Sequence, residues 1–441
     1  MSARSVALEG LRRCRRDSAW SDAVLDSLIR ADGLDRRDAA LATRLCYGVQ
    51  QNAALLDFYL SHWCSRPIEK LDPVVRDVLR LSAYQLVFLD RIPPSAVVNE
   101  AVALTKASGR AQAGRLVNAV LRRLAEHRAA LPEVPGAGTP EYLATRWSHP
   151  LWLARRLTEQ EGYAETAAFF ASNNAPAPVT LQVNTLRTDT AALAAALERE
   201  GFAPEAHPWL PDCLNLAGAG GLAETRAFRD GWFYIQDAAA ALSVLAADPK
   251  PGMRVLDACA APGGKSFAAA RAMESRGEVL ACDLHEKKLS RLKKGAERLG
   301  FVAIHTRAMD ARRPDKELLE SFDLVLADVP CSGLGVIRKK PDIREKDPAA
   351  LAALPEIQLA ILLGLADCVR PGGALLYSTC TVLQEENAAV VEAFLCRRSD
   401  FSPETPSLPF ASEASGELGV QLWPQRQGTD GFYFCKLRRT S

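Results

Sequence analysis

Carboxyl and thiol side chains recur at the ends of short apolar runs in the C-terminal half of the chain. Four of them close a predicted strand and two follow one shortly after, namely Asp257, Asp283, Asp328, Cys380, Asp310 and Cys331. A cysteine thiolate is a nucleophile, and a carboxylate can accept hydrogen bonds from two neighbouring hydroxyls. One acid at a strand end is ordinary, but several acids, two cysteines and a glycine-rich turn together indicate a ligand site.

The glycine-rich turn belongs to the stretch VLDACAAPGGKS, Val255 to Ser266. An apolar strand runs into a Pro-Gly-Gly turn, and a helix follows. Glycine lets backbone amides approach a ligand closely, and the unpaired N–H groups of a helix start attract an anion. The ending resembles a phosphate-binding P-loop, but Cys259 stands where that motif requires glycine. Taken alone, the stretch also fits a tight turn that binds nothing.

The acid at 283 gives the turn a more specific meaning. Asp283 follows Gly264 by 19 residues and ends the next predicted strand. An acid about 20 residues beyond such a turn suits a ribose diol, because both hydroxyls can donate to one carboxylate. The spacing therefore favours a nucleoside-containing ligand.

The elements that must position these side chains alternate between strand and helix. Strand-like runs are followed by helical patterns from residue 254 onward, with strands expected at 277–283, 301–305, 322–328 and 373–380. This alternation predicts an open, mostly parallel, doubly wound α/β sheet. In such sheets ligands bind outside the carboxyl ends of the strands. The acids and both cysteines are therefore expected at one edge of the sheet.

The rest of the chain predicts three further regions. Apolar residues recur at helical spacing throughout 1–130, which predicts an all-helical bundle. Pro and Gly crowd residues 131–140, as in a linker. Residues 141–230 mix helical and strand patterns and are expected to form a small α/β domain, followed by the doubly wound domain over 231–441.

Composition narrows the class of protein. The 441 residues include 48% hydrophobic and 24% charged residues, an ordinary globular composition with no uncharged run long enough for a membrane helix. Eleven cysteines never form a C-x-x-C pair, which argues against zinc or a disulfide framework and for a reducing cytoplasm; most are expected to be buried. Residues 1–130 hold 20 Lys and Arg against 14 Asp and Glu, which suits either nucleic acid or solvated helix faces.

Three stretches of the helical region, DVLRLSAYQLVFL, PPSAVVNEAVALTK and GRLVNAVLRRL, resemble the NusB family of RNA-binding helical bundles. The resemblance covers residues 1–130 and implies contact with RNA. It makes five arginines plausible phosphate partners: Arg4, Arg12, Arg13, Arg15 and Arg16. A bundle used only as a scaffold is the alternative.

Motifs of the C-terminal region are similar to those of S-adenosylmethionine-dependent RNA cytosine-5 methyltransferases of the NOL/NOP/Sun group. They are DACAAPGGKS, the acids at 283 and 310, ADVPCSGLG and YSTC, together with IRKKPDIR and GTDGFYF. With the NusB-like region, the whole chain resembles the bacterial Fmu/Sun type within that group. The resemblance implies a Rossmann-like class I methyltransferase domain with S-adenosylmethionine as cofactor. Ser266 stands where threonine is common, a change that should be tolerated.

The resemblance also carries binding roles to individual residues. The turn would wrap the cofactor through Cys259, Ala260, Ala261, Pro262, Gly263, Gly264 and Lys265. Asp283 would hold the ribose, Asp310 would contact adenine, and Asp328 would be shared between the cofactor and the target base. Lys265 has two candidate partners, the methionine carboxylate and RNA. The basic triplet at 338–340 either binds phosphate or forms a solvated loop.

Two cysteines are the candidates for the chemical steps of the reaction. Cytosine C5 is a poor nucleophile, but a thiolate that adds to C6 turns C5 into an enamine-like carbon able to take a methyl group. A base then removes the C5 proton, and elimination frees the thiol. The resemblance implies that Cys380 is the nucleophile and that Cys331 serves in release of the methylated product. Asp328 would stabilise charge on the cytosine ring. In cytosine-5 DNA methyltransferases the Pro-Cys cysteine attacks instead, so spacing alone leaves the two roles open.

The resemblance thus implies methylation of C5 of a cytosine in 16S ribosomal RNA through a covalent Cys–C6 adduct. The same chemistry on transfer RNA or DNA is one alternative, and a non-catalytic RNA-binding assembly factor is another. We expect small-subunit ribosomal RNA as the partner. We also expect a cytoplasmic monomer with no metal and no membrane attachment.

Overall fold

The computed structural model describes residues 2–17, 21–218, 220–410 and 415–440. Their contacts separate two compact units, which contain Met1–Ala175 with Ile337–Lys346, and Pro176–Val336 with Asp347–Ser441. These two units are coarser than the four regions expected from the sequence, so the boundaries at residues 130, 140 and 230 stay a prediction. Helices beyond the expected linker pack on the N-terminal bundle, as when the backbone N–H of Leu55 donates to the Ser148 hydroxyl at 3.1 Å.

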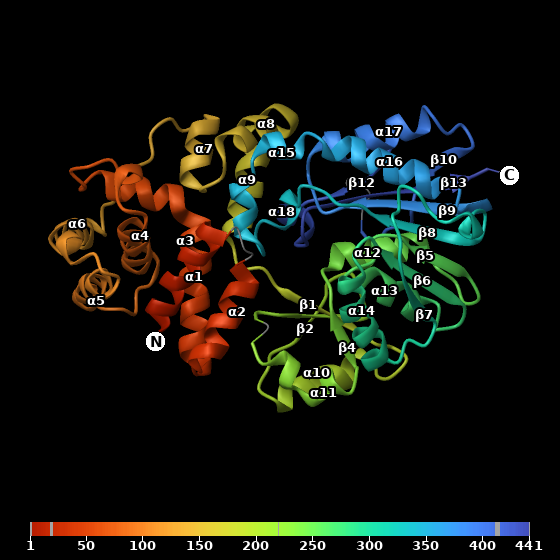
Figure 1. Ribbon diagram of the computed structural model, residues 1–441, viewed down its shortest axis with the longest axis horizontal. Helices are drawn as coiled ribbons and strands as arrows, with labels where there is room; N and C mark the ends of the chain where they lie inside the picture. Colours follow the sequence, from red (N-terminus) through yellow and green to blue (C-terminus); the bar gives the residue numbers. More distant parts are fainter. Residues whose placement is uncertain (1, 18–20, 219, 411–414, 441) are drawn as a thin grey trace. The chain divides into compact units, whose positions relative to one another are not determined.

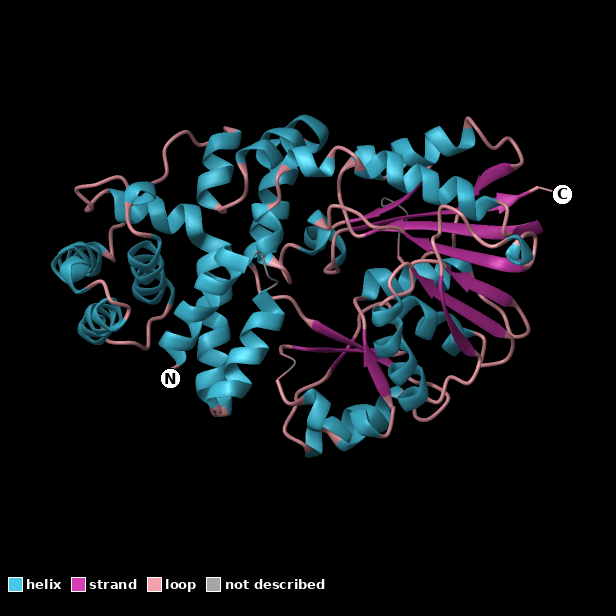
Figure 2. Cartoon of the chain, viewed as in Figure 1, coloured by secondary structure: helices cyan, strands magenta, loops and turns pink. Residues whose placement is uncertain are grey.

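The first unit is built from helices and their connecting loops (Figure 2). Its helices are α1 (Ala3–Asp17), α2 (Ser21–Asp32), α3 (Arg36–Ser61), α4 (Pro73–Phe88), α5 (Pro94–Ala107), α6 (Gly114–His127), α7 (Pro140–Arg146), α8 (Leu151–Glu161) and α9 (Tyr163–Asn174). α4 begins after Asp72, whose carboxylate accepts from the Val74 N–H at 2.9 Å, and Pro73 occupies the first turn. α3 and α4 pack so closely that a Cβ on Gly48 would overlap the Tyr84 ring.

A short segment from the C-terminal half, Ile337–Lys346, completes this first unit. Its side chain at 344 is a buried arginine whose guanidinium donates to the carbonyl oxygens of Gln51 at 2.7 Å and Ser148 at 2.9 Å. Burial lowers the pKa of Arg344 to about 9. Five polar contacts of this kind offset the cost of burying the cation, so the segment is an integral part of the helical unit.

The second unit contains a nine-stranded sheet and a four-stranded sheet. The larger sheet has the order β11-β12-β13-β9-β8-β5-β6-β7, with β10 paired to β13. Its strands are β5 (Arg254–Asp257), β6 (Glu278–Asp283), β7 (Ile304–Ala308), β8 (Phe322–Asp328), β9 (Val369–Thr379), β10 (Phe401–Glu404), β11 (Ser415–Gly416), β12 (Gly419–Leu422) and β13 (Phe432–Arg439). β9, β8, β5, β6 and β7 are mutually parallel, and β13 runs antiparallel to β9. The predicted doubly wound, mostly parallel fold is confirmed.

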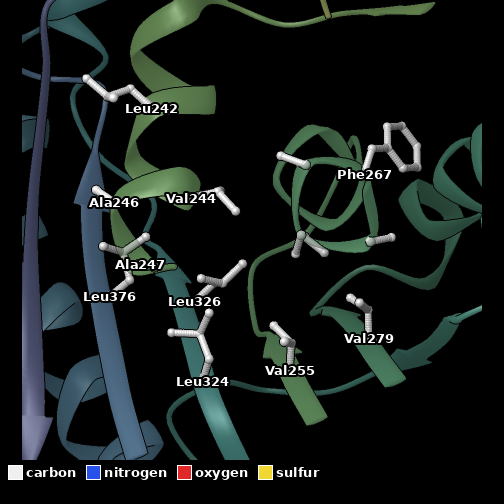
Figure 3. Close-up of a cluster of buried hydrophobic side chains, with 14 of the residues drawn as sticks. Leu242, Val244, Ala246, Ala247, Val255, Phe267, Val279, Leu324, Leu326 and Leu376 are labelled. Atoms are coloured by element: carbon white, nitrogen blue, oxygen red, sulfur yellow. The ribbon is translucent and has the colours of Figure 1, made fainter. Parts of the chain in front are cut away.

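Helices cover both faces of the larger sheet (Figure 1). They are α12 (Ala238–Ala247), α13 (Gly264–Ala272), α14 (Glu286–Leu299), α16 (Leu354–Ala366) and α17 (Ala388–Leu395). The same unit also contains the short helices α15 (Pro348–Leu351) and α18 (Pro424–Gln427). Val255 faces the core beneath α12 and α13, which Figure 3 shows with Val279 and Leu324 from neighbouring strands. Leu256, the next residue, belongs to the opposite core with α16 and α17, because side chains alternate along a strand.

The smaller sheet has the order β2-β3-β1-β4 and is antiparallel where registers are defined. Its elements are β1 (Val179–Val183), α10 (Thr190–Arg199), β2 (Glu205–Ala206), β3 (Cys213–Leu216), α11 (Arg226–Arg229) and β4 (Phe233–Ile235). The buried Asn184 amide donates to the Leu299 carbonyl at 2.9 Å, and Arg298 donates to the Phe233 carbonyl at 3.1 Å. These bonds fasten the smaller sheet to the end of α14.

The helical stretch Pro348–Ala366 is long and apolar enough to cross a membrane, judged by length and composition. In this structure its second part, α16, contributes Ile361, Leu362 and Leu365 to the core on one face of the larger sheet. The apolar character of this stretch therefore has a packing explanation within the unit.

Candidate active site

Two cysteines from neighbouring strands meet at the carboxyl edge of the larger sheet. β8 and β9 are parallel and in register at Asp328 and Ser378, so the loops that follow them leave the sheet side by side. Cys331 lies three residues beyond one register position and Cys380 two beyond the other. Their Sγ atoms are 3.2 Å apart. The structure thus brings together the two thiols that the sequence placed near separate strand ends.

The two thiols differ in acidity. The hydrogen bond between them lowers the pKa of Cys380 and raises the pKa of Cys331, because one sulfur carries the shared proton. The positive charge of Lys265 adds to the lowering at Cys380, and the negative charge of Glu386 adds to the raising at Cys331. This asymmetry makes Cys380 the better candidate for a thiolate.

An ion pair lies beside the thiols. The Lys265 Nζ, on the largely buried first turn of α13, is 2.7 Å from Asp328 Oδ2 and 5.0 Å from the centroid of the Phe432 ring. The other Asp328 oxygen accepts from the Ser378 hydroxyl at 3.0 Å. Ser378 was not singled out in the sequence, although its register with Asp328 places it there. Ser378 at the end of β9 and Lys265 at the start of α13 therefore fix the direction of the Asp328 carboxylate, and the Phe432 ring packs against Lys265.

The glycine-rich turn leaves a buried carboxyl group beneath it. Asp257, at the end of β5, is fully buried, and its Oδ2 accepts from the Ser266 hydroxyl at 2.7 Å. Its Oδ1 is buried without a hydrogen-bond partner. Burial is the main reason that the pKa of Asp257 rises to about 7. Gly263, at φ +120°, has no room for a Cβ, which would lie 2.7 Å from Phe267 Cζ.

The two acids expected to contact a nucleoside have different surroundings. Asp283 is largely buried at the end of β6, where its Oδ1 accepts from the His285 N–H at 2.9 Å and lies 3.9 Å from Lys288 Nζ. Asp310 is paired on both carboxylate oxygens with the Arg312 guanidinium, which lowers its pKa. Asp283 is therefore well placed to accept from a ribose, whereas contact of Asp310 with adenine would require sharing with Arg312.

The last glycine-rich motif, GTDGFYF, packs against the Cys380 loop. The Gly335 N–H donates to the Cys380 carbonyl at 2.9 Å, and the Gly431 N–H donates to the Gly335 carbonyl at 2.8 Å. A Cβ on Gly335 would overlap the Gly431 carbonyl oxygen. Two loops far apart in sequence thus hold the backbone of Cys380 through glycine contacts.

The basic residues proposed to contact RNA phosphates are largely engaged within the first unit. Arg12 and Arg13 pair with Glu9, and Arg15 pairs with the buried Asp77. Arg4 donates to the Gln85 side chain at 2.7 Å. In the basic triplet at 338–340, Arg338 is buried and belongs to the helical unit. Phosphate contact by these arginines would therefore involve exchange of protein partners.

The cysteines are spread over both units, and none is part of a disulfide. All eleven cysteines are free thiols. Five of them are buried, namely Cys46, Cys213, Cys282, Cys368 and Cys435. The expectation that most cysteines would be buried is therefore wrong. Loops and helix ends, rather than core positions, hold the remainder. Within the residues that the structure describes, His, Cys, Asp and Glu side chains form no group of three suited to a metal ion.

Known families match most of the chain. Residues 1–126 match the NusB family, 149–222 match the ferredoxin-like domain of RsmF/B-like methyltransferases, and 244–438 match the family of 16S rRNA methyltransferases RsmB/F. The chain is 38% identical over 450 residues to the probable ribosomal RNA small subunit methyltransferase B of Bacillus subtilis, covering 99% of both chains. It is 35% identical over 407 residues to the ribosomal RNA small subunit methyltransferase B of Erwinia tasmaniensis, covering 91% of this chain and 90% of that one.

Solved structures agree with these sequence matches. The crystal structure of PH0851 superposes with a TM-score of 0.83 at 26% identity, covering 100% of this chain and 99% of the other. The structure of NSun6 from Pyrococcus horikoshii gives a TM-score of 0.58 at 22% identity over 70% of this chain and 99% of the other, a likeness of fold. With full-length identity above one third to curated relatives, this chain belongs to the ribosomal RNA small subunit methyltransferase B family.

Proposed function

We propose that this chain methylates C5 of a cytosine in 16S ribosomal RNA through a covalent Cys380–C6 adduct. The observation that carries the proposal is the pair of thiols 3.2 Å apart beside the Lys265–Asp328 ion pair. Adjacent thiols of unequal acidity suit a reaction that needs both a nucleophile and a proton carrier. The names of the relatives support small-subunit ribosomal RNA as the substrate.

Residues around the glycine-rich turn fit S-adenosylmethionine. The buried Asp257 Oδ1 lacks a partner, the Gly263 backbone leaves no space for a side chain, and the Asp283 carboxylate lies at the same edge of the sheet. We assign cofactor binding to residues 259–265, with Asp283 at the ribose and Asp310 at the adenine. When bound, S-adenosylmethionine supplies an electrophilic methyl group on a sulfonium centre.

The first step that the protein residues carry out is nucleophilic attack on the cytosine ring. The Cys380 sulfur forms a bond to C6 of a cytosine that has left its base stack, and the electron pair of the C5–C6 bond becomes available at C5. The Asp328 carboxyl, hydrogen-bonded to N3 and the exocyclic amine, stabilises charge that develops on the ring. Lys265 adjoins this carboxylate and adds positive charge near the attacking sulfur.

The second step is removal of the C5 proton after methylation. Cys331, acting as a proton shuttle, takes the C5 proton at sulfur while its own proton passes to water. The C5–H electron pair restores the C5–C6 double bond, and the electron pair of the C6–S bond returns to Cys380. Product release therefore depends on Cys331, whereas attack depends on Cys380.

The helical unit is assigned to RNA binding by its match to the NusB family. RNA of the small subunit is the proposed partner, and we expect the chain to act as a monomer in the cytoplasm. Neither a metal ion nor a membrane has a role in the proposed reaction.

A labelling experiment tests the proposed function. The protein is incubated with methyl-labelled S-adenosylmethionine and 16S ribosomal RNA that lacks the modification, and the labelled nucleotide is mapped. We expect label on C5 of one cytosine, and none above background with Cys380→Ala, although that variant should still bind the cofactor. Label that appears in transfer RNA but not in ribosomal RNA, or in neither, would contradict the proposal.

A further inference from the structure

Glu386 is a buried carboxyl group next to the thiols that the reaction described above does not use. It ends the short 3-10 helix Gln384–Glu386 that follows the Cys380 loop, and it is 1% exposed. Its Oε1 is buried without a hydrogen-bond partner. No lysine or arginine of the described residues forms an ion pair with it. A buried carboxylate without a cation is costly, so its retention calls for an explanation.

The other Glu386 oxygen holds the loop that carries Cys331. Oε2 accepts from the backbone N–H of Ser332 at 2.8 Å and from the Gln358 amide at 2.8 Å. The same Gln358 nitrogen donates to the Pro330 carbonyl at 3.0 Å. Residues on both sides of Cys331 are therefore tied to this one carboxylate, directly at Ser332 and through Gln358 at Pro330.

The same hydrogen-bond network includes the Cys380 loop and β9, the strand that precedes it. The Ser332 and Thr381 hydroxyls are 2.6 Å apart, and each residue directly follows one of the cysteines. The Glu386 carbonyl accepts from the Tyr377 hydroxyl of β9 at 2.6 Å. These contacts fix the position of Glu386 relative to both thiols.

Negative charge surrounds Cys331 from several elements. Asp328 faces it from β8, Cys380 from the end of β9, and Glu386 from the 3-10 helix. Positive charge acts at the other thiol, where Lys265 offsets Asp328 and Asp430. Glu386 thus supplies a fixed negative charge on the side of Cys331.

We propose that Glu386 is a positioning residue that fixes the Pro330–Ser332 loop and assigns proton transfer, rather than attack, to Cys331. This inference rests on the proposed function, because it concerns the division of labour between the thiols. A fixed negative charge beside Cys331 keeps that thiol protonated and makes its sulfur the more basic of the two. Both properties suit a proton carrier and disfavour a competing nucleophile.

Thiol titration tests the charge effect without any RNA. In a Cys380→Ser background, alkylation of Cys331 by iodoacetamide is followed by mass spectrometry as a function of pH. Replacing Glu386 by Gln should shift the alkylation midpoint of Cys331 to lower pH by about one unit. The control Glu392→Gln removes an equal charge from an exposed position of α17 and should leave the midpoint in place. An unchanged midpoint in Glu386→Gln overturns the inference, even if methylation activity is present.

Kinetics on the otherwise unaltered enzyme test the positioning effect. Glu386→Gln should lower kcat about tenfold with KM for RNA unchanged, and a denaturation-resistant protein–RNA adduct should accumulate because release is slowed. Should that variant fail to fold, Gln358→Leu removes the tether to Pro330 while keeping the carboxylate, and should also accumulate adduct. A folded variant that turns over at the normal rate without adduct contradicts the inference. Absence of methylation in the unaltered protein would instead contradict the proposed function, and the thiol titration keeps the two failures apart.

Discussion

The loops after β8 and β9 are built alike but differ in their charged neighbours, because a cation acts only on the second of the two cysteines. Each follows a parallel strand, and each presents a partly exposed cysteine followed by a hydroxyl residue, Ser332 or Thr381. Lys265 lies on the Cys380 side, and Glu386 lies on the Cys331 side. Position alone makes the two thiols near equivalents, so their neighbours must decide which sulfur attacks. On the proposed assignment, the role of each cysteine depends on buried charge, not on its place at a strand end.

Removal of the Lys265 charge should have the largest effect on the difference in acidity between Cys380 and Cys331. Lys265→Met deletes the partner of Asp328 and the cation that acts on Cys380, while the long apolar stem is retained. We expect the methylation rate to fall roughly 10³-fold, as on loss of a charge-stabilising group in an active site. Alkylation of Cys380 should also move to higher pH. Lys294→Met, on the exposed surface of α14, is the control, and an unshifted Cys380 titration would show that Lys265 does not set its acidity.

Backbone displacement of one loop should have a smaller effect. Gly335→Ala introduces a Cβ that overlaps the Gly431 carbonyl, so the N–H bond to the Cys380 carbonyl must shift. A displacement of about 1 Å can reduce the rate about 100-fold, and we expect a loss of that order with cofactor affinity unchanged. Gly218→Ala is the matched control because it has open space around it. A Gly335→Ala enzyme with normal turnover would mean that the glycine contacts do not position Cys380.

The smallest effect is expected from the buried Asp257 carboxyl beneath the glycine-rich turn. The pKa of Asp257 rises from 3.8 to about 7 in the folded protein, so the folded state holds a proton that the unfolded state has lost across that window. As the pH rises from 4 to 7, this group should therefore lower the free energy of unfolding by roughly 1.4 kcal/mol per pH unit. Chemical denaturation of the cofactor-free protein at several pH values should show a flatter dependence in Asp257→Asn. Glu392→Gln should keep the original slope, and equal slopes in all three proteins would refute the buried-acid account.

Much of the sheet could be predicted from the sequence because its signals are local. Apolar runs that end in an acid mark individual strands, and β8 has the predicted bounds of 322–328. Alternation with helices implies parallel order, which in turn places Asp328 and Cys380 at one edge. The pairing of the two thiols follows from this topology, although their separation does not.

The remaining features depend on contacts between residues distant in sequence. Nothing around Glu386 marks it as buried, since Glu385 precedes it and both look like solvated acids. The segment Ile337–Lys346 sits between strands in sequence yet belongs to the helical unit, because Arg344 finds its carbonyl partners there. Arg312 follows Asp310 by two residues, and only the turn geometry shows that it occupies that carboxylate. Long-range packing and side-chain direction are what one-dimensional patterns do not contain.

Identification of the cysteine bound to RNA tests the central claim most directly. Cys331→Ala, incubated with unmodified 16S ribosomal RNA and S-adenosylmethionine, should retain a denaturation-resistant adduct. After digestion with nuclease and protease, mass spectrometry should find the modified nucleotide on the peptide that contains Cys380, with one added methyl group. An adduct formed instead by Cys331 in the Cys380→Ala variant would reverse the two roles and contradict this account.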